Sequence, residues 1–198
     1  RATAVSHYYS ETRDIAIYLA SLFKASFPAY YEKYSKAFEA GQWTEADPGP
    51  WIGRAVVFKL QVECHVDGLD NGPSAIFCAG EGRFSGGECL LPDLNIKLSY
   101  RPGHVFIFMA AHLYHQIMPW KPLGSRDEHQ MAPGRVGHVF FFPENSLAIL
   151  DGKPEKWNQR TGGGLKDSNR DPTYTKLDLP LGTQNYLRSL SGQPLLPV

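Results

Sequence analysis

The sequence predicts a mainly β protein with N-terminal helices, built as a jelly roll or a related β-sandwich. The first forty residues have helical periodicity, and most of the next hundred alternate in short segments with a period of two. The 198 residues include 19 glycines and 15 prolines, and this supply of turn residues favours short strands over a helical bundle. A chain of this length can bury the core of one domain.

Residues 5–40 carry the helical pattern, and their apolar side chains recur on one stripe. The stripe consists of Ile15, Leu19, Leu22 and Phe23. Pro28 predicts a break and the start of a second helix, and Gly41 predicts a C-terminal cap. We therefore expect residues 1–46 to form two helices that pack on the barrel.

Residues 56–65 have the sharpest strand pattern in the chain. One face of the expected strand is apolar, with Phe58, Leu60, Val62 and Cys64. The other face is polar, with Lys59, Gln61, Glu63 and His65. In a small barrel the polar face would line an internal cavity, and Lys59 or Gln61 could contact a bound molecule there. The apolar face would be covered by the N-terminal helices.

Residues 47–143 are expected to form the jelly-roll core. Further strands are predicted at residues 75–79, 88–91, 96–100, 104–109 and 136–142. Short strands at this spacing, separated by glycine or proline, are typical of sandwiches and jelly rolls. Residues 144–198 are polar and lack clear periodicity, so we expect a C-terminal extension that wraps the core.

Composition narrows the functional classes. Twenty basic residues balance twenty acidic ones, so the net charge gives no evidence for a polyanionic partner. Three cysteines without CxxC spacing argue against a disulfide framework and a structural zinc site. We interpret Cys64, Cys78 and Cys89 as reduced core residues of a soluble intracellular protein, because the sequence shows neither a signal peptide nor a long apolar run.

A metal site is indicated by His65 and Asp67, which stand two residues apart at the end of an expected strand. At that spacing both side chains can turn toward one point inside a barrel. A histidine from a distant strand would complete a facial triad of two histidines and one carboxylate, the ligand set of non-haem iron(II) oxygenases. His115 is the preferred third ligand, and His112 is the alternative.

The order of motifs between residues 54 and 143 resembles that of the 2-oxoglutarate-dependent oxygenases. After HVD comes FSGGECLLPDLNIKLSYRPGHVFIFMAAHLYHQ, and then PGRVGHVFFF, in which an arginine opens an apolar strand. The resemblance implies a double-stranded β-helix with iron(II) held by His65, Asp67 and His115. It also implies 2-oxoglutarate as co-substrate, with an arginine that binds its far carboxylate.

Within this superfamily the chain is most similar to the fungal branch of the TET/JBP group. The similarity lies in the stretch from HVD to GGE and in PGRVGHVFFFPENS, followed by KPEKW and RTGG. It implies oxidation of a methylated base in DNA, 5-methylcytosine first and N6-methyladenine second, and a nuclear location. The chain departs from the group's pattern at His104, where members often have aspartate, and at Gly137, where they often have serine.

The arginine that binds the co-substrate is expected to be Arg135. This residue begins an apolar strand, where an unpaired guanidinium would be costly unless it bound an anion. Arg126 is the alternative, but it lies in a polar stretch beside Asp127 and Glu128, which could pair with it at the surface.

Asp70 stands five residues after His65, where TET-like enzymes resemble one another in placing a side chain that contacts the exocyclic amine of the target base. An ionised aspartate only accepts hydrogen bonds, which suits an amino-bearing base better than thymine. Alternatively, Asp70 simply begins a turn, because DNGP is favourable turn chemistry.

Two other functions fit the same sequence. One is the same oxygenase chemistry on a protein side chain or a small molecule, which the neutral net charge favours. The other is a jelly-roll binding module without catalytic activity, in which the triad is vestigial.

Overall fold

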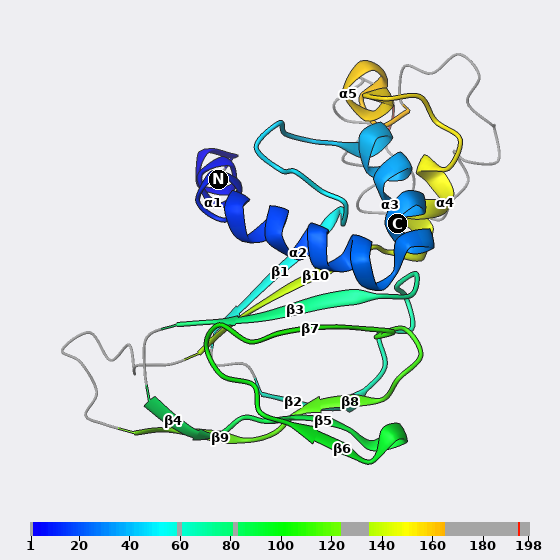
Figure 1. The fold of residues 1–198 in the computed structure, drawn as a ribbon. Helices are drawn as coiled ribbons and strands as arrows, with labels where there is room; N and C mark the ends of the chain where they lie inside the picture. The colour runs from blue at the N-terminus through cyan, green and yellow to red at the C-terminus, as the bar shows by residue number, and fades with distance from the viewer. Residues whose placement is uncertain (1, 59–60, 81–82, 124–134, 165–193, 195–198) are drawn as a thin grey trace.

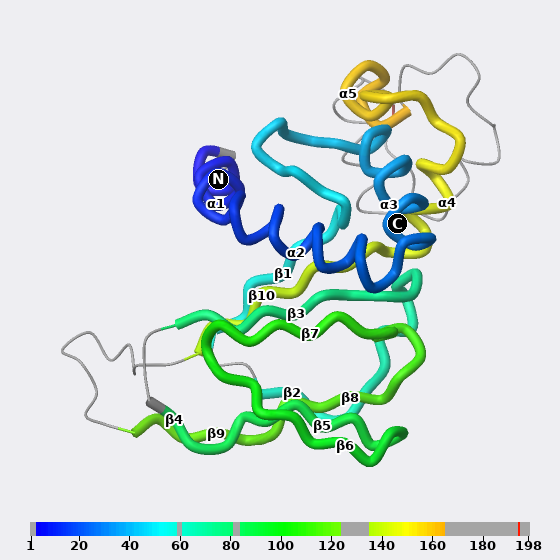
Figure 2. The backbone as a smooth tube through the Cα atoms, in the orientation of Figure 1, coloured from blue at the N-terminus to red at the C-terminus, as the bar shows by residue number. Residues whose placement is uncertain are grey.

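A computed structural model shows two facing β-sheets with helices packed on the outer side of one of them (Figure 1). The backbone trace follows the chain as it passes back and forth between the two sheets (Figure 2). The structure describes residues 2–58, 61–80, 83–123, 135–164 and 194.

Both large sheets contain four antiparallel strands. The first has the order β1 (Gly53–Phe58), β10 (Val136–Phe141), β3 (Ser74–Ala79), β7 (Val105–Phe108). The second has the order β2 (Val62–His65), β8 (His115–Ile117), β5 (Cys89–Leu91), β6 (Ile96–Leu98). A short pair of strands extends this layer, β4 (Arg83–Gly86) and β9 (Trp120–Leu123), and the 3-10 turn η1 (Pro92–Leu94) links β5 to β6. The prediction of a mainly β protein with N-terminal helices is confirmed.

The first sheet has two buried faces, and alternate residues of its strands serve different cores. In β3, Ile76 and Cys78 face the space between the sheets, whereas Ala75 and Phe77 face the helices. In β10, Val139 packs with the inter-sheet core and Phe140 with the helical core. The inner faces of the two sheets therefore enclose the barrel interior.

The N-terminal region forms three helices rather than the two predicted: α1 (Ala2–Glu11), α2 (Arg13–Ser26) and α3 (Pro28–Gly41). Pro28 begins α3 as predicted, because its fixed φ suits the first helical position. The break at Thr12 was not predicted. Gly41 is the last helical residue rather than a cap beyond the helix, and a Cβ there would lie 2.5 Å from the Leu150 side chain.

Trp51 occupies the centre of the core between the helices and the first sheet. Its side chain is fully buried, stacks on Phe23 with the ring centroids 4.4 Å apart, and donates a hydrogen bond from Nε1 to the Pro73 carbonyl at 3.1 Å. Burial of a large aromatic ring that also satisfies its N–H is strongly stabilising. Trp51 thus ties α2 to the segment that leads into β3.

The expected single strand over residues 56–65 is wrong. Residues 53–58 form β1 of the first sheet, and residues 62–65 form β2 of the second sheet. The alternation was counted across a crossover between sheets, so the two halves do not share one face. Phe58 remains 66% exposed, and the N-terminal helices instead cover the outer face of β3 and β10.

The C-terminal segment is also more ordered than expected up to residue 164. It forms α4 (Glu144–Leu150) and α5 (Trp157–Thr161), and Leu147, Leu150 and Trp157 are buried in the helical core. These helices are only seven and five residues long, too short for a periodic signal to stand out. The remainder of the predicted extension lies outside the described residues, apart from Pro194.

The cysteines are free, but they are not all core residues. Cys78 and Cys89 are buried between the sheets, whereas Cys64 is exposed, which corrects its interpretation as a core residue. None of the helices in the described part of the chain has the length and hydropathy needed to cross a membrane.

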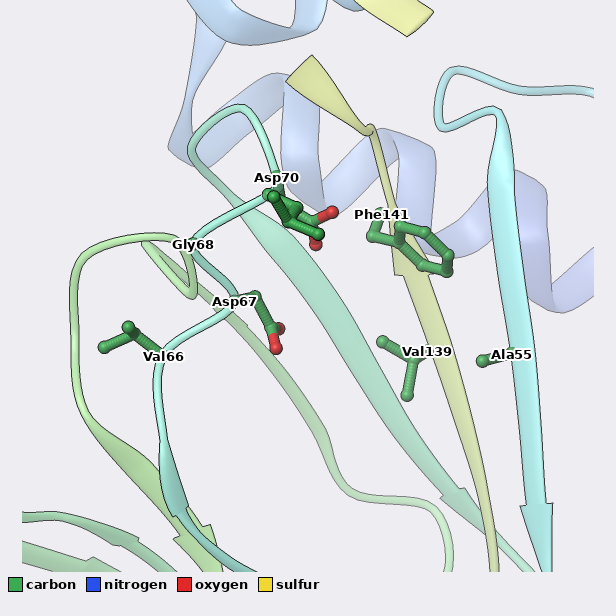
Figure 3. A pocket seen from close by; sticks show the side chains of 8 residues that line it. Ala55, Val66, Asp67, Gly68, Asp70, Val139 and Phe141 are labelled. Carbon is green, nitrogen blue, oxygen red and sulfur yellow. The ribbon is translucent and has the colours of Figure 1, made fainter. Parts of the chain in front are cut away.

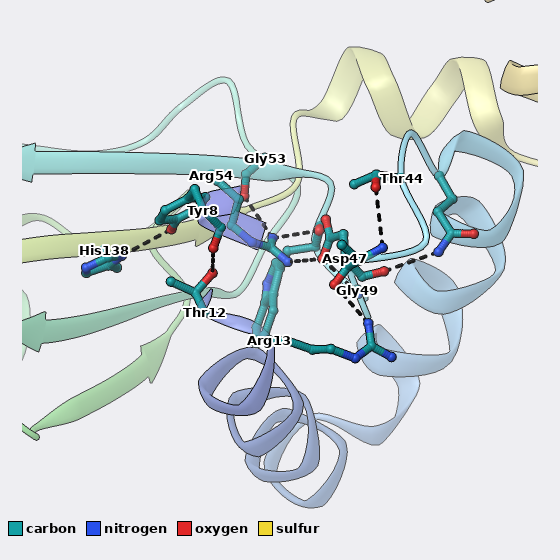
Figure 4. A network of polar contacts seen from close by, with 12 residues as sticks. Tyr8, Thr12, Arg13, Thr44, Asp47, Gly49, Gly53, Arg54 and His138 are labelled. Atoms are coloured by element: carbon teal, nitrogen blue, oxygen red, sulfur yellow. Dashed lines mark hydrogen bonds and ion pairs between the residues drawn. The ribbon is translucent and has the colours of Figure 1, made fainter. Parts of the chain in front are cut away.

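A buried ion pair joins the linker after α3 to the first sheet (Figure 4). Arg54 Nη2 lies 2.7 Å from Asp47 Oδ1, both side chains are 6% exposed, and the guanidinium also stacks on Phe140. Arg13 of α2 donates to two linker carbonyls beside this pair. Burial raises the pKa of Asp47 and lowers the pKa of Arg54, so desolvation outweighs the attraction within the pair.

We therefore predict that removing one partner of the Asp47–Arg54 pair lowers the free energy of unfolding by far more than the attraction between the two charges. Asp47→Ala leaves an uncompensated buried guanidinium and should lower the free energy of unfolding by about 3–5 kcal/mol. Urea denaturation measures the change. Glu32→Ala, which removes an exposed helical ion pair with Lys36, is the control and should cause no measurable loss. Equal stability of the two variants would contradict this interpretation.

Candidate metal centre

Two histidines of the candidate metal centre form a cross-strand pair. His65 ends β2 and His115 begins β8, and the antiparallel register places the two residues directly opposite each other. Their ring centroids are 4.3 Å apart. Because directly opposed residues project to the same face of a sheet, the pairing alone brings these side chains together.

Asp67 joins the histidines from the loop that follows β2. Its backbone N–H donates to the Ala110 carbonyl at 2.9 Å, which fixes the loop against the segment before β8. Its carboxylate oxygens lie 3.4 Å from His65 Nε2 and 3.7 Å from His115 Nε2. The candidate ligand atoms of the three residues all lie within 4.8 Å of one another.

Both imidazoles are held in the orientation that a metal ligand requires. His65 Nδ1 lies 2.8 Å from the Glu63 carbonyl oxygen, and His115 Nδ1 lies 3.0 Å from that of Leu113. A carbonyl oxygen only accepts, so each Nδ1 donates its proton and each Nε2 keeps a free lone pair. This hydrogen-bonding pattern is the one found behind metal-bound histidines.

The cluster has one protected side and one open side. The His115 side chain is 8% exposed, while those of Asp67 and His65 are 29% and 37% exposed. His112, the alternative third ligand, is exposed and is not part of the group. Such a set could hold a divalent transition metal and leave coordination positions free.

A cavity of about 390 Å³ opens beside Asp67. Figure 3 shows the carboxylates of Asp67 and Asp70 pointing toward the inner faces of β10 and β1. The other walls are almost entirely apolar: Ala55, Val66, Gly68, Leu69, Val139 and Phe141. A pocket of this size, with apolar walls and a few polar groups, is typical of a small-molecule or base-binding site.

Asp70 belongs both to a turn and to this cavity. Its Oδ2 accepts a hydrogen bond from Ser74 Oγ at 3.4 Å, and Gly72 in the following turn has a φ of +77°. The pKa of Asp70 is raised to about 6, first by burial and then by the charge of Asp67, against the lowering effect of Ser74. A cation bound by Asp67 would offset that repulsion.

Arg135 lies just before β10 and is 1% exposed. Its Nη1 donates to the Gly87 carbonyl at 2.6 Å. Nε and Nη2 are buried and have no hydrogen-bond partner among the described residues. The Cys78 thiol lies near Arg135. Burial raises the pKa of this thiol, and Arg135 opposes the increase. Sulfur is a weak acceptor, and the contact lacks hydrogen-bond geometry.

The glycine pair of the sequence makes room for this arginine. A Cβ on Gly87 would lie 2.0 Å from Arg135 Nη1, so no other residue fits without moving the guanidinium. Phe84 and Tyr100 pack around the guanidinium, with its central carbon 5.2 Å and 4.7 Å from their ring centroids. The arginine is therefore fixed by contacts that leave two of its donor groups unused.

The histidine cluster and Arg135 share the barrel interior. His115 and Ile117 lie two positions apart in β8, and Ile117 pairs with Cys89 of β5. Gly87, which contacts Arg135, stands two positions before Cys89. The inner surface of the second sheet thus runs from the metal-ligand cluster to the guanidinium.

Several residues considered in the sequence analysis lie elsewhere. Arg126 and Lys59 are outside the described residues, and Gln61 is exposed. His104 is exposed and its Nδ1 contacts the Ser99 carbonyl at 2.8 Å. The roles of Gly87 and Tyr100 were not predicted from the sequence, and the signal for Tyr100 was a polar residue that ends an apolar segment.

No protein-family profile matches the chain, and no curated protein sequence matches it. Among solved structures the chain is similar to NgTET1 in complex with 5mC DNA, with a TM-score of 0.53 and 21% sequence identity. The similarity covers 82% of this chain and 60% of that chain. A likeness at this identity establishes a shared fold, and the jelly roll expected from the sequence is confirmed.

Proposed function

We propose that this protein is an iron(II)- and 2-oxoglutarate-dependent dioxygenase of the TET/JBP group that oxidises a methylated base in DNA. The preferred base is 5-methylcytosine, with N6-methyladenine second. The observation that carries the proposal is the cluster of His65, Asp67 and His115 at the wall of an apolar cavity. The fold shared with NgTET1, a chain seen in complex with 5mC DNA, supports the same assignment.

The residues present fit the proposed metal. Two imidazoles and one carboxylate are the donor set suited to non-haem iron(II), and with each Nδ1 bonded to a carbonyl it is Nε2 that faces Asp67 and would coordinate the metal. When bound, iron(II) and 2-oxoglutarate would together activate dioxygen for the oxidation of an unreactive C–H bond. His65, Asp67 and His115 would hold the ion.

The residues also fit the proposed co-substrate. Arg135 is buried and has two unused donors, Nε and Nη2, on one edge of its guanidinium. That edge matches the two oxygens of a carboxylate, and a charge-assisted bidentate pair is both strong and directional. Arg135 would therefore bind the far carboxylate of 2-oxoglutarate and orient its other end toward the metal-ligand cluster.

The cavity accounts for the proposed substrate. Val139 and Phe141 provide an apolar wall on which a planar base could pack, and Leu69, which is 83% exposed, lies at the rim of the pocket. Asp70 Oδ2 is engaged by Ser74, which leaves Oδ1 to accept a hydrogen bond from an exocyclic amine. A base within duplex DNA would have to leave the stack to enter such a pocket, and DNA as substrate implies action in the nucleus.

The decisive experiment incubates the protein with methylated duplex DNA, iron(II), ascorbate and 2-oxoglutarate, and analyses the nucleosides by mass spectrometry. Oxidised 5-methylcytosine is expected. Succinate formation without any oxidised nucleoside would instead favour a protein or small-molecule substrate. Binding to DNA should weaken steeply with salt, because phosphate contacts release counterions.

We predict that the metal site needs all three ligands. His65→Ala, Asp67→Ala and His115→Ala should each lower the affinity for iron(II) by more than about 100-fold, beyond the usual effect of losing an outer-shell partner. Anaerobic calorimetry measures the affinity, and circular dichroism checks the fold. His112→Ala is the matched control and should bind iron(II) normally; the reverse result would identify His112 as the third ligand.

We predict that Arg135→Ala raises the concentration of 2-oxoglutarate needed for half-maximal turnover by about tenfold to a hundredfold, since a charge-assisted hydrogen bond is worth about 1.5–3 kcal/mol. Gly87→Ala should act in the same direction because its side chain would displace the guanidinium. Arg126→Ala is the control. If Arg126→Ala and Arg135→Ala have equal effects, Arg135 is not the specific anchor.

We predict that Asp70 selects the base without serving the metal. In Asp70→Ala, oxidation of methylated DNA should fall by about tenfold to a few hundredfold through the loss of one charge-assisted hydrogen bond. Iron-dependent turnover of 2-oxoglutarate in the absence of DNA should persist. Glu144→Ala, which removes a nearby carboxylate bonded to Asn71, is the control. Unchanged DNA oxidation in Asp70→Ala would reduce Asp70 to a turn residue.

A further inference from the structure

Tyr100 follows β6 and presents an unusual buried hydroxyl. The residue is 1% exposed, and its Oη has no hydrogen-bond partner among the described residues. Its ring packs on Phe106 with the centroids 5.3 Å apart, and the Arg135 guanidinium lies over the Tyr100 ring with its Cζ 4.7 Å from the ring centroid. Buried hydroxyls are normally paired, and leaving one unpaired is costly. A fully buried phenol in this position therefore requires an explanation.

The same part of the core holds two further unused donors, Nε and Nη2 of Arg135. A guanidinium has no acceptor atoms, so Tyr100 and Arg135 cannot satisfy each other through it. Burial raises the pKa of Tyr100, with Cys78 adding to the increase and Arg135 opposing it, so the phenol keeps its proton. Three donors are thus gathered in a region where the described residues supply no matching acceptor.

A compact anion with several acceptor sites would satisfy all three donors at once. A carboxylate offers two oxygens with about four acceptor positions, enough for both guanidinium donors and one hydroxyl. No second hydroxyl is available from the adjacent strand, since Gly137 is the next residue on the inner face of β10 after Arg135. Tyr100 is therefore a hydroxyl-bearing side chain whose ring packs directly on this guanidinium.

We propose that Tyr100 donates its O–H to the carboxylate that Arg135 binds, and so acts as a second binding residue for the dicarboxylic co-substrate. This inference rests on the proposed function and deepens it, because it assigns recognition of the far carboxylate of 2-oxoglutarate to a tyrosine and an arginine acting together. The ring holds the guanidinium in place, and the hydroxyl completes the set of donors. A 2-oxo acid without a second carboxylate would gain nothing from either group.

The chain offers a matched control in Tyr34. Its hydroxyl is likewise buried and unpaired, but its ring lies in the helical core, 5.5 Å from the ring of Phe23 and 4.8 Å from that of Phe142. Tyr34→Phe and Tyr100→Phe each remove one unsatisfied hydroxyl and keep the packed ring. Only Tyr100→Phe removes the hydroxyl of a ring that packs on Arg135.

The test is isothermal titration of the full chain, loaded with Mn(II) so that no turnover occurs, with 2-oxoglutarate and with 2-oxobutyrate, which lacks the second carboxylate. Tyr100→Phe should bind 2-oxoglutarate about five- to tenfold more weakly, the loss expected for one hydrogen bond. Its affinity for 2-oxobutyrate should equal that of the wild type. Without ligand, both Phe variants should melt a few degrees above the wild type, about 2–4 °C, because an unsatisfied group has been removed.

Equal affinity of Tyr100→Phe and the wild type for 2-oxoglutarate would overturn the proposal while leaving the proposed function intact. A parallel loss of affinity for 2-oxobutyrate would also overturn it, since the effect would then not involve the far carboxylate. The same weakening in Tyr34→Phe would assign the effect to general changes in packing. A wild-type protein that binds no 2-oxoglutarate would refute both this inference and the proposed co-substrate.

Discussion

The antiparallel pairing of β2 with β8 is the interaction on which the candidate site depends. It sets His65 opposite His115 and leaves Asp67 free to turn back toward both imidazoles. A shift of register by one residue would send one histidine to the opposite face of the sheet. The pairing is short, so it relies on the fixed distance between the two sheets, which the inter-sheet core maintains through Ile117, Cys89 and Ile76. The geometry of the ligands is therefore a property of the whole barrel rather than of a local motif.

Polar groups inside that barrel are arranged at a cost to stability. Arg135 is held by one carbonyl and two aromatic rings, yet two of its donors and the hydroxyl of Tyr100 find no acceptor in the part of the chain that the structure describes. A core selected for stability alone would not keep such groups, since apolar replacements of the same shape would avoid the penalty. The Tyr34 hydroxyl is also unpaired among the described residues, but these donors lie beside a buried charge, which favours the proposal that they bind a separate molecule. In the buried Asp47–Arg54 pair, by contrast, each charge has its partner within the protein.

The fold class and the three clustered residues could be predicted from the sequence. The assignment of strands to the two sheets could not. Strands β3 and β10 were predictable because alternate residues face different buried layers, and Pro28 could be placed at a helix start because its ring fixes φ. Strands β4, β8 and β9 were missed because each is short and lacks an apolar run: β4 ends on a glycine, β9 contains Pro122, and two of the three residues of β8 are polar. The segment 56–65 was misinterpreted because an alternating pattern cannot reveal that its two halves pair with different sheets. The role of Tyr100 was beyond reach, since an unpaired hydroxyl is visible only when all its neighbours are known.

Both faces of the first sheet are buried, and this affects which substitutions the protein can tolerate. On β10, Val139 and Phe141 face the cavity, whereas the intervening Phe140 belongs to the layer under the helices. Neighbouring residues of β10 therefore have different roles, because one faces the cavity and the next packs under the helices. Substitutions on the cavity side can change which molecules fit the pocket. The helices packed on the other face of the sheet keep the backbone in place. Substitutions on the cavity side could therefore change specificity in related barrels without disturbing the backbone that keeps the candidate metal ligands together.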